Sequence, residues 1–358
     1  MHAVRISRLI KAMREEKAQA FFLSNEENSG QPDTEYLTGF SGTTSQLLVT
    51  AKGECFLFVD GRYVERAKKE ARGINVVPVS AVAPFSKSLA LLINKLSVKK
   101  ILIDGKMTSV ATFMRLKKML PGISFSQQPG ILQKVRMIKD AKEIALVTKA
   151  CAITRDSFDK IKNRIAARMT EIEVAKMLEK EFYLQGATGV AFPSIVASGK
   201  NGSQPHAVPT NKKLRKGELV TIDCGAAYRG YMADFTRTIV VGGGSPPARL
   251  KRHLEAVIRA QRAGCAMILP GLGADEIDGV CRAVLREAKM EEYFAHGTGH
   301  GVGREVHEMP IISPRSDTVL QPGMILTVEP GVYIPGVGGI RIEDTVLVTK
   351  KGFKNLTG

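Results

Sequence analysis

Tryptophan is absent from the 358 residues, and aromatic side chains as a whole make up only 6% of them. Proteins that bind single-stranded nucleic acid combine a basic groove with aromatic rings on which the bases stack. The chain is basic, with a formal charge of +17, but residues 1–133 carry 19 basic and 11 acidic side chains (+8) and the remainder carries 33 and 24 (+9). Since the excess charge is spread over the whole chain, we expect no nucleic acid partner.

Cysteine and long apolar runs are scarce as well. The five cysteines are odd in number, widely spaced and form no C-x-x-C pair, which is typical of reduced, buried thiols in a cytoplasmic protein. No run approaches the ~20 apolar residues that span a bilayer, so we expect no membrane partner. Basic residues are interspersed with apolar ones over residues 4–18, which predicts an amphipathic helix there rather than a signal peptide.

The length of the chain is sufficient for two domains. Helical and strand patterns alternate over residues 1–132 and predict a small α/β domain, with helices expected over 85–95 and 110–119. Pro129-Gly130 then interrupts the pattern. Residues 133–358 begin with helices and continue with hairpins, which predicts an α+β domain in which helices cover a curved antiparallel sheet.

Two helix starts in the second domain have local signals. Thr170 and Glu173 have the spacing of a capping box, and the helix that they open is expected to end at Gly186. Ser245 followed by Pro246 predicts an N-cap and a first helical position. These signals place helices on either side of the central strands.

Histidine is also rare, with six residues, and three of them lie between positions 296 and 307. Four glycines alternate through residues 296–303, and each would cost a helix about 1 kcal/mol. We therefore expect an extended or looped backbone that another segment approaches closely. In an extended chain His296 and His300 are roughly 13 Å apart, so we expect one to bind a metal and the other to act beside it. The glycines fit no G-x-G-x-x-G motif, because Val302 occupies a glycine position, and no H-E-x-x-H motif is present.

Two aspartates lie on a predicted hairpin. Asp223 ends the run 219–223, Asp234 follows Tyr231, and the turn is expected at 228–230. If the hairpin closes there, the two carboxylates share a face, directly or diagonally opposite, with Cβ atoms about 5–8 Å apart. Carboxylates that face each other repel unless a cation or a proton lies between them.

Two glutamates follow strand patterns near the end of the chain. Glu329 ends the alternating run 324–328 before Pro330, and Glu343 shares a strand face with Arg341. Four carboxylates with one imidazole neutralise two divalent cations, and two ions about 3.5–4 Å apart can share a bridging hydroxide. An oxygen-rich set with one imidazole suits Mn²⁺, Co²⁺, Fe²⁺ or Zn²⁺. The candidate ligands are Asp223, Asp234, His300, Glu329 and Glu343.

Several segments resemble the aminopeptidase P and prolidase branch of the pita-bread metallopeptidases, in the order of that family. They are Pro205-His206-Ala207, residues 221–225, residues 234–238, residues 296–303, residues 327–331 and residues 339–344, together with residues 36–42 and 60–63 in the first domain. The resemblance implies a C-terminal pita-bread catalytic domain after a creatinase-like N-terminal domain, a homodimer, and two divalent ions, Mn²⁺ first among them. It also implies that the five candidate ligands bind these ions.

The resemblance further implies hydrolysis of the bond between a first residue and a following proline. It implies that His206, His296 and His307 line the pocket. We expect His206 and His307 to donate hydrogen bonds to the developing oxyanion, and His296 to contact the substrate backbone. Glu329 is expected to carry a proton toward the leaving nitrogen, and Arg341 to orient Glu343.

Other functions are compatible with parts of this pattern. A prolidase, which accepts only Xaa-Pro dipeptides, is the nearest alternative. Methionine aminopeptidase shares the catalytic fold but lacks a leading domain of this length. A creatinase-like amidinohydrolase has no metal, and a silent binding module on the same fold would have lost ligands. Because all five ligand positions are retained, the metal-dependent aminopeptidase is favoured.

Overall fold

A computed structural model describes residues 2–27, 29 and 32–358. The chain divides into two compact units, Met1–Val135 and Arg136–Gly358. The sequence places the division at 132/133, slightly before this point. No helix among the described residues is both long and apolar enough to cross a membrane.

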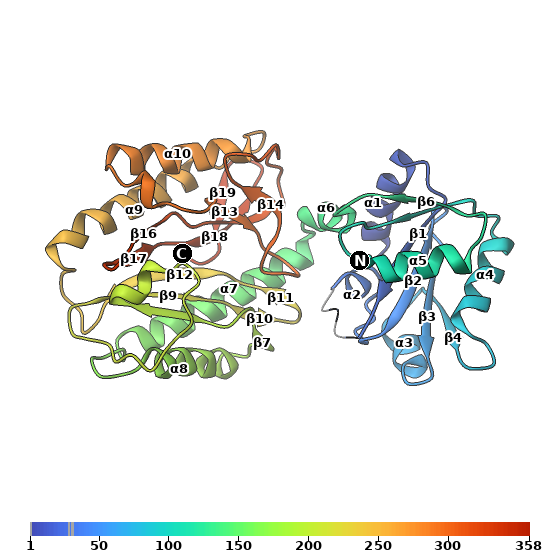
Figure 1. Ribbon diagram of the computed structural model, residues 1–358, viewed down its shortest axis with the longest axis horizontal. Helices are drawn as coiled ribbons and strands as arrows, with labels where there is room; N and C mark the ends of the chain where they lie inside the picture. Colours follow the sequence, from blue (N-terminus) through green and yellow to red (C-terminus); the bar gives the residue numbers. More distant parts are fainter. Residues whose placement is uncertain (1, 28, 30–31) are drawn as a thin grey trace. The chain divides into compact units, whose positions relative to one another are not determined.

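The first unit is built on one six-stranded sheet (Figure 1). Its strands are β1 (Ala20–Asn25), β2 (Ser45–Thr50), β3 (Cys55–Asp60), β4 (Asn75–Val79), β5 (Lys100–Ile103) and β6 (Ser124–Gln127). The strand order is β4-β3-β2-β1-β5-β6, with β1, β2 and β3 antiparallel and the outer strands parallel to their neighbours. Its helices are α1 (His2–Glu15), α2 (Asp33–Thr38), α3 (Val64–Glu70), α4 (Phe85–Lys95), α5 (Val110–Met119) and α6 (Ile131–Met137), the last crossing the division.

The expected helices over 85–95 and 110–119 are confirmed as α4 and α5. Their apolar positions pack against the sheet, where Leu89, Ile93 and Leu116 are buried with β1 and β5 residues. The α/β class predicted for this unit is therefore correct. The edge strands β4 and β6, which we did not predict, are short and carry polar or half-exposed residues, so their pattern is weak.

The second unit contains four long helices and antiparallel strands (Figure 1). The helices are α7 (Ala141–Lys162), α8 (Glu171–Leu184), α9 (Ala248–Met267) and α10 (Ala274–Glu287), with 3₁₀ turns η1 (Gly199–Ser203) and η2 (Glu291–Tyr293). The earlier strands are β7 (Gly189–Val190), β8 (Ile195–Ser198), β9 (Leu219–Cys224), β10 (Ala226–Tyr228), β11 (Tyr231–Met232) and β12 (Phe235–Val240). The later strands are β13 (Gly299–Gly301), β14 (Glu308–Ile312), β15 (Ile325–Val328), β16 (Gly331–Ile334), β17 (Gly338–Arg341), β18 (Asp344–Val348) and β19 (Phe353–Asn355).

In Figure 1 the strands of this unit lie between the α9–α10 pair and the α7–α8 pair. Each pair buries its apolar face on a different group of strands. Helices α9 and α10 form a core with β15, β17 and β18, and α7 and α8 form another with β8, β9 and β12. The α+β class with helix-covered antiparallel strands is confirmed. Because the helices cover the faces of the strands, polar residues can lie at the strand ends.

One helix start was predicted correctly and one was not. Thr170 accepts from Glu173 N at 3.1 Å while Glu173 accepts from Thr170 N at 2.7 Å, so the capping box exists. The α9 helix starts at Ala248, and its N-cap is Pro247 rather than Ser245. A residue before a proline is driven out of the helical region, and the consecutive prolines therefore delay the start. All five cysteines are buried and unbridged, as their pattern predicts.

Candidate metal centre

The two aspartates meet where strands β9 and β12 end. Thr236 lies opposite Asp223 in the antiparallel ladder, so Asp234, two positions earlier, is its diagonal neighbour on the same face. This is one of the two placements that the sequence predicts. The turn at 228–230 closes the connection through β10 and β11.

The two backbones of the hairpin approach each other closely between Asp223 and Asp234. A Cβ atom added at Gly225 would lie 1.9 Å from the carbonyl oxygen of Ala233, which no side chain can tolerate. Glycine at this position therefore allows the backbones to approach, and the approach sets the separation of Asp223 and Asp234.

The histidine-rich segment is extended, as predicted. Its strand β13 pairs with β14 and β15. A Cβ at Gly299 would lie 2.1 Å from the carbonyl oxygen of Thr327, so the glycine admits a close backbone neighbour. His300 follows, and its backbone N–H donates to Thr327 Oγ1 at 3.0 Å.

His300 presents one ring nitrogen to carboxylates and the other to the backbone. Its Nδ1 lies 3.2 Å from the carbonyl oxygen of Gly301, which can only accept, so the proton is assigned to Nδ1. Its Nε2 lies 3.2 Å from Glu329 Oε1 and 3.6 Å from Asp234 Oδ2. A metal-binding histidine is oriented in this way, with its second nitrogen hydrogen-bonded to a carbonyl.

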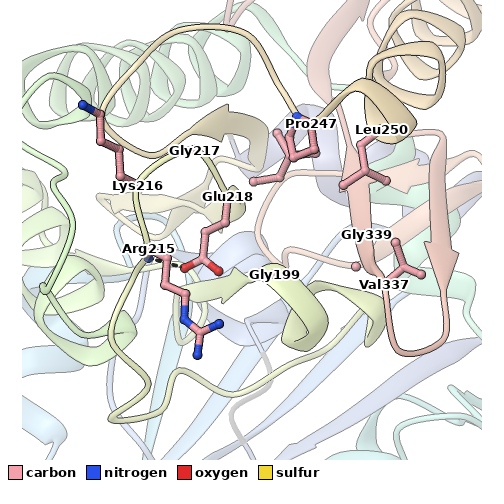
Figure 2. Close-up of a pocket in the computed structure, with 11 residues that line it drawn as sticks. Gly199, Arg215, Lys216, Gly217, Glu218, Pro247, Leu250, Val337 and Gly339 are labelled. Atoms are coloured by element: carbon pink, nitrogen blue, oxygen red, sulfur yellow. Dashed lines mark hydrogen bonds between the residues drawn. The ribbon is translucent and has the colours of Figure 1, made fainter.

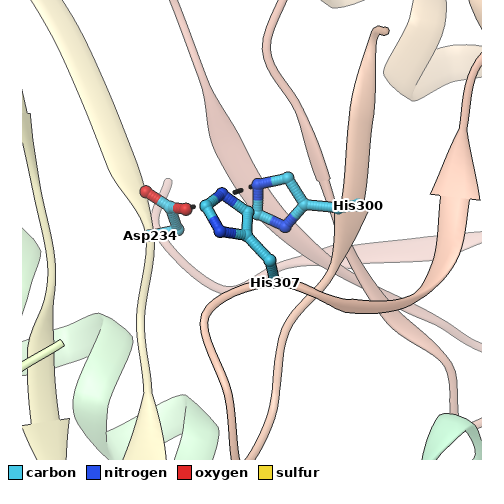
Figure 3. A group of neighbouring side chains, drawn as sticks. All are labelled: Asp234, His300 and His307. Atoms are coloured by element: carbon cyan, nitrogen blue, oxygen red, sulfur yellow. Dashed lines mark ion pairs between the residues drawn. The ribbon is translucent and has the colours of Figure 1, made fainter. Parts of the chain in front are cut away.

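The five expected ligands converge, and a sixth residue joins them. Three overlapping groups offer ligand atoms that lie within 4.8 Å of one another: Asp223, Asp234 and Glu343; His300, Glu329 and Glu343; and Asp234, His300 and His307. Figure 3 shows the last group, with Asp234 facing the rings of His300 and His307, which pack edge to face. We call Asp223, Asp234, His300, Glu329 and Glu343 the ligand cluster.

Burial and mutual repulsion shift the pKa values within the ligand cluster. Burial, followed by the charge of Glu343, raises the pKa of Asp234 well above its usual value. Burial and Glu329 do the same for Glu343. Burial would raise the pKa of Glu329 also, but the hydrogen bond from His300, protonated on both ring nitrogens, outweighs this and lowers the pKa to about 2. Nε2 of His300 must lose that proton before it can bind a cation. Such crowding of carboxylates favours a bound cation.

Two carboxylate oxygens identify where a cation fits. Among the described residues, Asp223 Oδ1 and Glu343 Oε1 are buried and have no hydrogen-bond partner. Their companion oxygens are held, since Arg341 donates to Asp223 Oδ2 and Thr236 Oγ1 donates to Glu343 Oε2, each at 2.6 Å. A buried oxygen without a donor is costly, and oxygen ligands with one imidazole fit hard or borderline divalent ions.

Arg341 does not bind the carboxylate that we expected. Its guanidinium contacts Asp223, whereas Thr236 orients Glu343. The chain leaves the β17 strand at Arg341, so Arg341 and Glu343 do not continue side by side on one strand. Another guanidinium nitrogen of Arg341 donates to Tyr333 Oη at 2.7 Å.

Tyr333 connects Arg341 to His296. The hydroxyl lies 2.8 Å from His296 Nε2, and His296 Nδ1 lies 2.7 Å from the carbonyl oxygen of Gly297. Because that carbonyl only accepts, His296 carries its proton on Nδ1 and accepts the Tyr333 proton at Nε2. Both ring nitrogens of His296 are thus engaged within the chain, and its contact with substrate stays a prediction.

The role of Tyr333 was not predicted from the sequence, although a local pattern indicates the strand that carries it. Residues 331–334 join a β-branched and aromatic run to the turn at Pro335-Gly336. Such a run before a turn predicts a hairpin strand, and β16 does pair with β17. That reading would have placed the Tyr333 side chain near Arg341.

The other two histidines expected to line the pocket, His206 and His307, are exposed. His206 follows η1, and the carbonyl oxygen of its neighbour Pro205 accepts from Arg341 at 3.4 Å. The rings of His300 and His307 are 4.3 Å apart, edge to face. Burial and then the charge of His300 lower the pKa of His307, so His307 is a neutral imidazole that can donate one N–H at neutral pH.

Helix α10 anchors the beginning of the histidine-rich segment. Asp278 is fully buried and accepts from Thr298 N at 3.0 Å and from Thr298 Oγ1 at 2.9 Å. Arg282, paired with Asp278, donates to the carbonyl oxygen of His296 at 2.6 Å. Charged hydrogen bonds of this kind are stronger than neutral ones, so they fix the backbone that carries His296.

A second set of charges anchors the end of the same segment. Lys139 Nζ lies 2.7 Å from Glu308 Oε1, and both side chains are only 1% exposed. Arg136 Nε lies 3.5 Å from Glu308 Oε2, and Arg136 also pairs with Glu305. Glu308 directly follows His307, so these charges hold the backbone beside that imidazole.

A cavity of about 340 Å³ lies apart from the ligand cluster (Figure 2). Arg215, Glu218, Leu250 and Gly339 are among its lining residues. Arg215 N donates to Glu218 Oε1 at 2.6 Å. None of the five ligand residues lines it, so it offers the cluster no direct space for a ligand.

Comparison with known proteins places both units. Metallopeptidase family M24 matches residues 145–350, and the creatinase/prolidase N-terminal domain matches residues 5–138. A solved Xaa-Pro dipeptidase from Bacillus anthracis is 37% identical, with a TM-score of 0.93 over 100% of this chain and 98% of its own. A solved X-Pro aminopeptidase from Thermotoga maritima is 34% identical, with a TM-score of 0.88 over 97% of each chain. The Xaa-Pro dipeptidase of Pyrococcus horikoshii is 35% identical over 353 residues, 99% of this chain and 96% of its own.

Proposed function

The chain belongs to metallopeptidase family M24, and on this premise we propose that it is an Xaa-Pro aminopeptidase, which hydrolyses the bond between the first residue of a peptide and a following proline. The observation that carries the proposal is the convergence of four carboxylates and His300 within reach of one another. The flanking imidazoles of His206, His296 and His307 support it, because a peptidase needs polar groups beside its nucleophile.

The ligand cluster would hold two divalent cations, Mn²⁺ in the first instance. When bound, such ions activate water for attack and polarise the scissile carbonyl group. Within the ligand cluster, Asp223 Oδ1 and Glu343 Oε1 are the buried carboxylate oxygens that have no hydrogen-bond partner, and we propose that they bind the cations. Asp234, His300 Nε2 and Glu329 complete the set that we propose.

The chain supplies groups that hold or transfer protons. Burial opposes ionisation of Glu329, but the hydrogen bond from His300 prevails and lowers its pKa to about 2. Its carboxylate is therefore ionised at neutral pH. This contact would be lost once His300 Nε2 binds a cation, and we propose that Glu329 then accepts a proton and passes it toward the leaving proline nitrogen. The exposed ring of His307 can donate to the oxygen on which negative charge develops, and we propose the same for His206.

His296 has a different role in this proposal from the one its position in the sequence suggests. Its nitrogens are held by Gly297 and Tyr333, so a hydrogen bond to substrate would require one of these contacts to open. We propose that its ring forms a fixed wall of the pocket, and that Arg341 fixes both this wall and Asp223.

Kinetic assays with matched peptides test the proposal. The purified protein is incubated with Mn²⁺ or Co²⁺ and an Xaa-Pro-Yaa tripeptide, an Xaa-Ala-Yaa control and an Xaa-Pro dipeptide. Release of the first residue from the proline tripeptide only in the presence of metal is the expected result. Glu343→Gln should abolish it, since that carboxylate completes two of the candidate ligand groups.

The alternative is an Xaa-Pro dipeptidase, and it is favoured by the names of two relatives described above. The same assay separates the two. Cleavage of the dipeptide with no release from the tripeptide would replace the aminopeptidase by a dipeptidase. Absence of cleavage of either peptide with either metal would contradict both.

A further inference from the structure

Glu171, the first residue of α8, carries a carboxylate that is surrounded by donors. Its side chain is 0% exposed. Among the described residues five groups donate to it: Ser198 N at 2.8 Å, Ser198 Oγ at 2.7 Å, Asn201 Nδ2 at 3.1 Å, Thr210 N at 3.0 Å and Thr210 Oγ1 at 2.6 Å. Burial raises the pKa of Glu171, but the hydrogen bonds from Thr210 and Ser198 outweigh burial and lower it. The group is therefore a buried carboxylate at neutral pH.

The donors come from the two ends of a single loop. Ser198 is the last residue of β8, and Thr210 lies twelve positions later; between them runs the segment 199–209, which we call the His206 loop. The backbone supports the same closure, because Ile172 N donates to the carbonyl oxygen of Thr210 at 3.2 Å. One side chain thus ties the start of this loop to its end.

The middle of the His206 loop reaches the candidate metal centre. The carbonyl oxygen of Pro205 accepts from Arg341 at 3.4 Å, and Arg341 also binds Asp223. Burial lowers the pKa values of His296 and His307, and the nearby His206 lowers both further. The Pro205 contact thus places the backbone next to His206 at the guanidinium that binds Asp223.

Lys212 also stabilises the closed base of the His206 loop. Lys212 Nζ donates to Ser198 Oγ at 2.6 Å and to Glu218 Oε1 at 3.0 Å. Ser198 Oγ can accept from Lys212 while it donates to Glu171. Figure 2 shows Gly199, where the loop begins, and Glu218 around the separate cavity described above. The loop base is thus a network in which each hydroxyl both donates and accepts.

We propose that Glu171 is a positioning residue for the peptidase reaction, which holds the His206 loop closed at its base so that the His206 imidazole faces the ligand cluster. The inference rests on the proposed function for its kinetic part. Its structural part, the control of the loop by Glu171, stands on the contacts alone. Glu171 acts through His206 and does not touch substrate.

The contacts indicate which substitution removes this control with the least change in shape. Every group that faces Glu171 is a donor, and a carboxylate only accepts. In Glu171→Gln an amide NH₂ faces donors, so about half of the contacts are lost and buried N–H or O–H groups remain unsatisfied. Glu173→Gln, two positions along the same helix, changes an exposed capping residue and serves as the matched control.

A double-mutant cycle tests the kinetic part. We expect E171Q to lower kcat for an Xaa-Pro tripeptide by up to about 100-fold through misplacement of the His206 ring, with a smaller change in KM, and E173Q to stay within twofold of the wild type. The E171Q/H206A variant should be no slower than H206A alone. Losses that multiply in the double variant, or an H206A variant as active as the wild type, would overturn the link between Glu171 and His206.

Amide hydrogen exchange tests the structural part without any turnover. We expect E171Q to exchange faster than the wild type over residues 199–209, with unchanged exchange in α10, whether or not the wild type proves to be a peptidase. Unchanged exchange over residues 199–209 would refute the proposal, while an inactive wild type would instead refute the proposed function. If E171Q does not fold, Thr210→Val removes the 2.6 Å contact with Glu171 together with the acceptor of Lys212 N, and it should give a smaller change of the same sign.

Discussion

The guanidinium of Arg341 donates to Asp223 Oδ2 at 2.6 Å, although Glu343 lies only two residues away along the chain. The same guanidinium holds Tyr333, and Tyr333 holds His296. One cation therefore fixes a candidate metal ligand and an imidazole wall of the pocket together. Substitutions of residues connected in this way are expected to have non-additive effects on activity.

Arg341→Lys should lower kcat/KM by about 10- to 100-fold and reduce metal affinity by a similar factor. A lysine ammonium keeps the positive charge but cannot contact Asp223 and Tyr333 through separate planar N–H groups. Steady-state kinetics and metal titration followed by elemental analysis measure the two effects. Arg286→Lys, at an exposed ion pair, is the control, and equal behaviour of the two variants would contradict this role for Arg341.

Gly225→Ala should destabilise the protein by about 1–3 kcal/mol and weaken metal binding. The new Cβ would lie 1.9 Å from the carbonyl oxygen of Ala233, so the hairpin must open and separate Asp223 from Asp234. Denaturant unfolding and metal titration measure the change. Gly279→Ala adds a Cβ that meets nothing within 4 Å and should stabilise α10 by about 0.5–1 kcal/mol. If Gly225→Ala changed neither stability nor metal binding, the close approach of the two backbones would have no effect on the ligands.

Glu308→Gln should lower the free energy of unfolding by about 3–5 kcal/mol, because it leaves the buried side chains of Lys139 and Arg136 without their carboxylate partner. Lys139 Nζ is 2.7 Å from this carboxylate, and both side chains are 1% exposed. Urea unfolding at neutral pH measures the loss. Glu291→Gln, at an exposed pair with Arg286, should cost far less, because solvent screens an exposed ion pair. Similar losses in the two variants would mean that the buried pair contributes no more than an exposed one.

Acid should remove the stabilisation that Glu171 provides. Burial works against ionisation, but hydrogen bonds lower the pKa of Glu171 in the folded chain below the unfolded value of about 4.3. Its stabilisation is therefore present above pH of about 4.3 and is lost as the pH falls through the folded pKa. We expect the difference in unfolding free energy between wild type and E171Q to narrow from pH 6 to pH 3. A difference that stays constant over this range would contradict a lowered pKa.

The sequence could point to the five residues of the ligand cluster because local signals mark them, and the structure brings their side chains together; their role as metal ligands stays a prediction. Asp223 and Asp234 flank a turn, and Glu329 precedes a proline, so their positions follow from short-range patterns. The Thr170 capping box is equally local. Such features depend on neighbours within a few residues, which are visible in a single sequence.

The partners of Arg341 and Glu171 could not be predicted in this way. Arg341 contacts Asp223 across 118 positions, and Glu171 contacts Thr210 across 39. These contacts arise when separate hairpins and helices pack, and no spacing rule encodes them. A glutamate at the start of a helix is read as a favourable dipole contact, which conceals the loop closure that Glu171 performs.

The backbone segments that carry His206, His296 and His307 are each held by a different part of the fold. Glu171 on α8 holds the loop of His206, Asp278 and Arg282 on α10 hold the backbone at His296, and Lys139 holds the residue after His307. The four carboxylates, in contrast, lie at strand ends that pair with one another. Substitutions in one anchor can therefore shift one imidazole at a time, while the ligand cluster keeps its geometry.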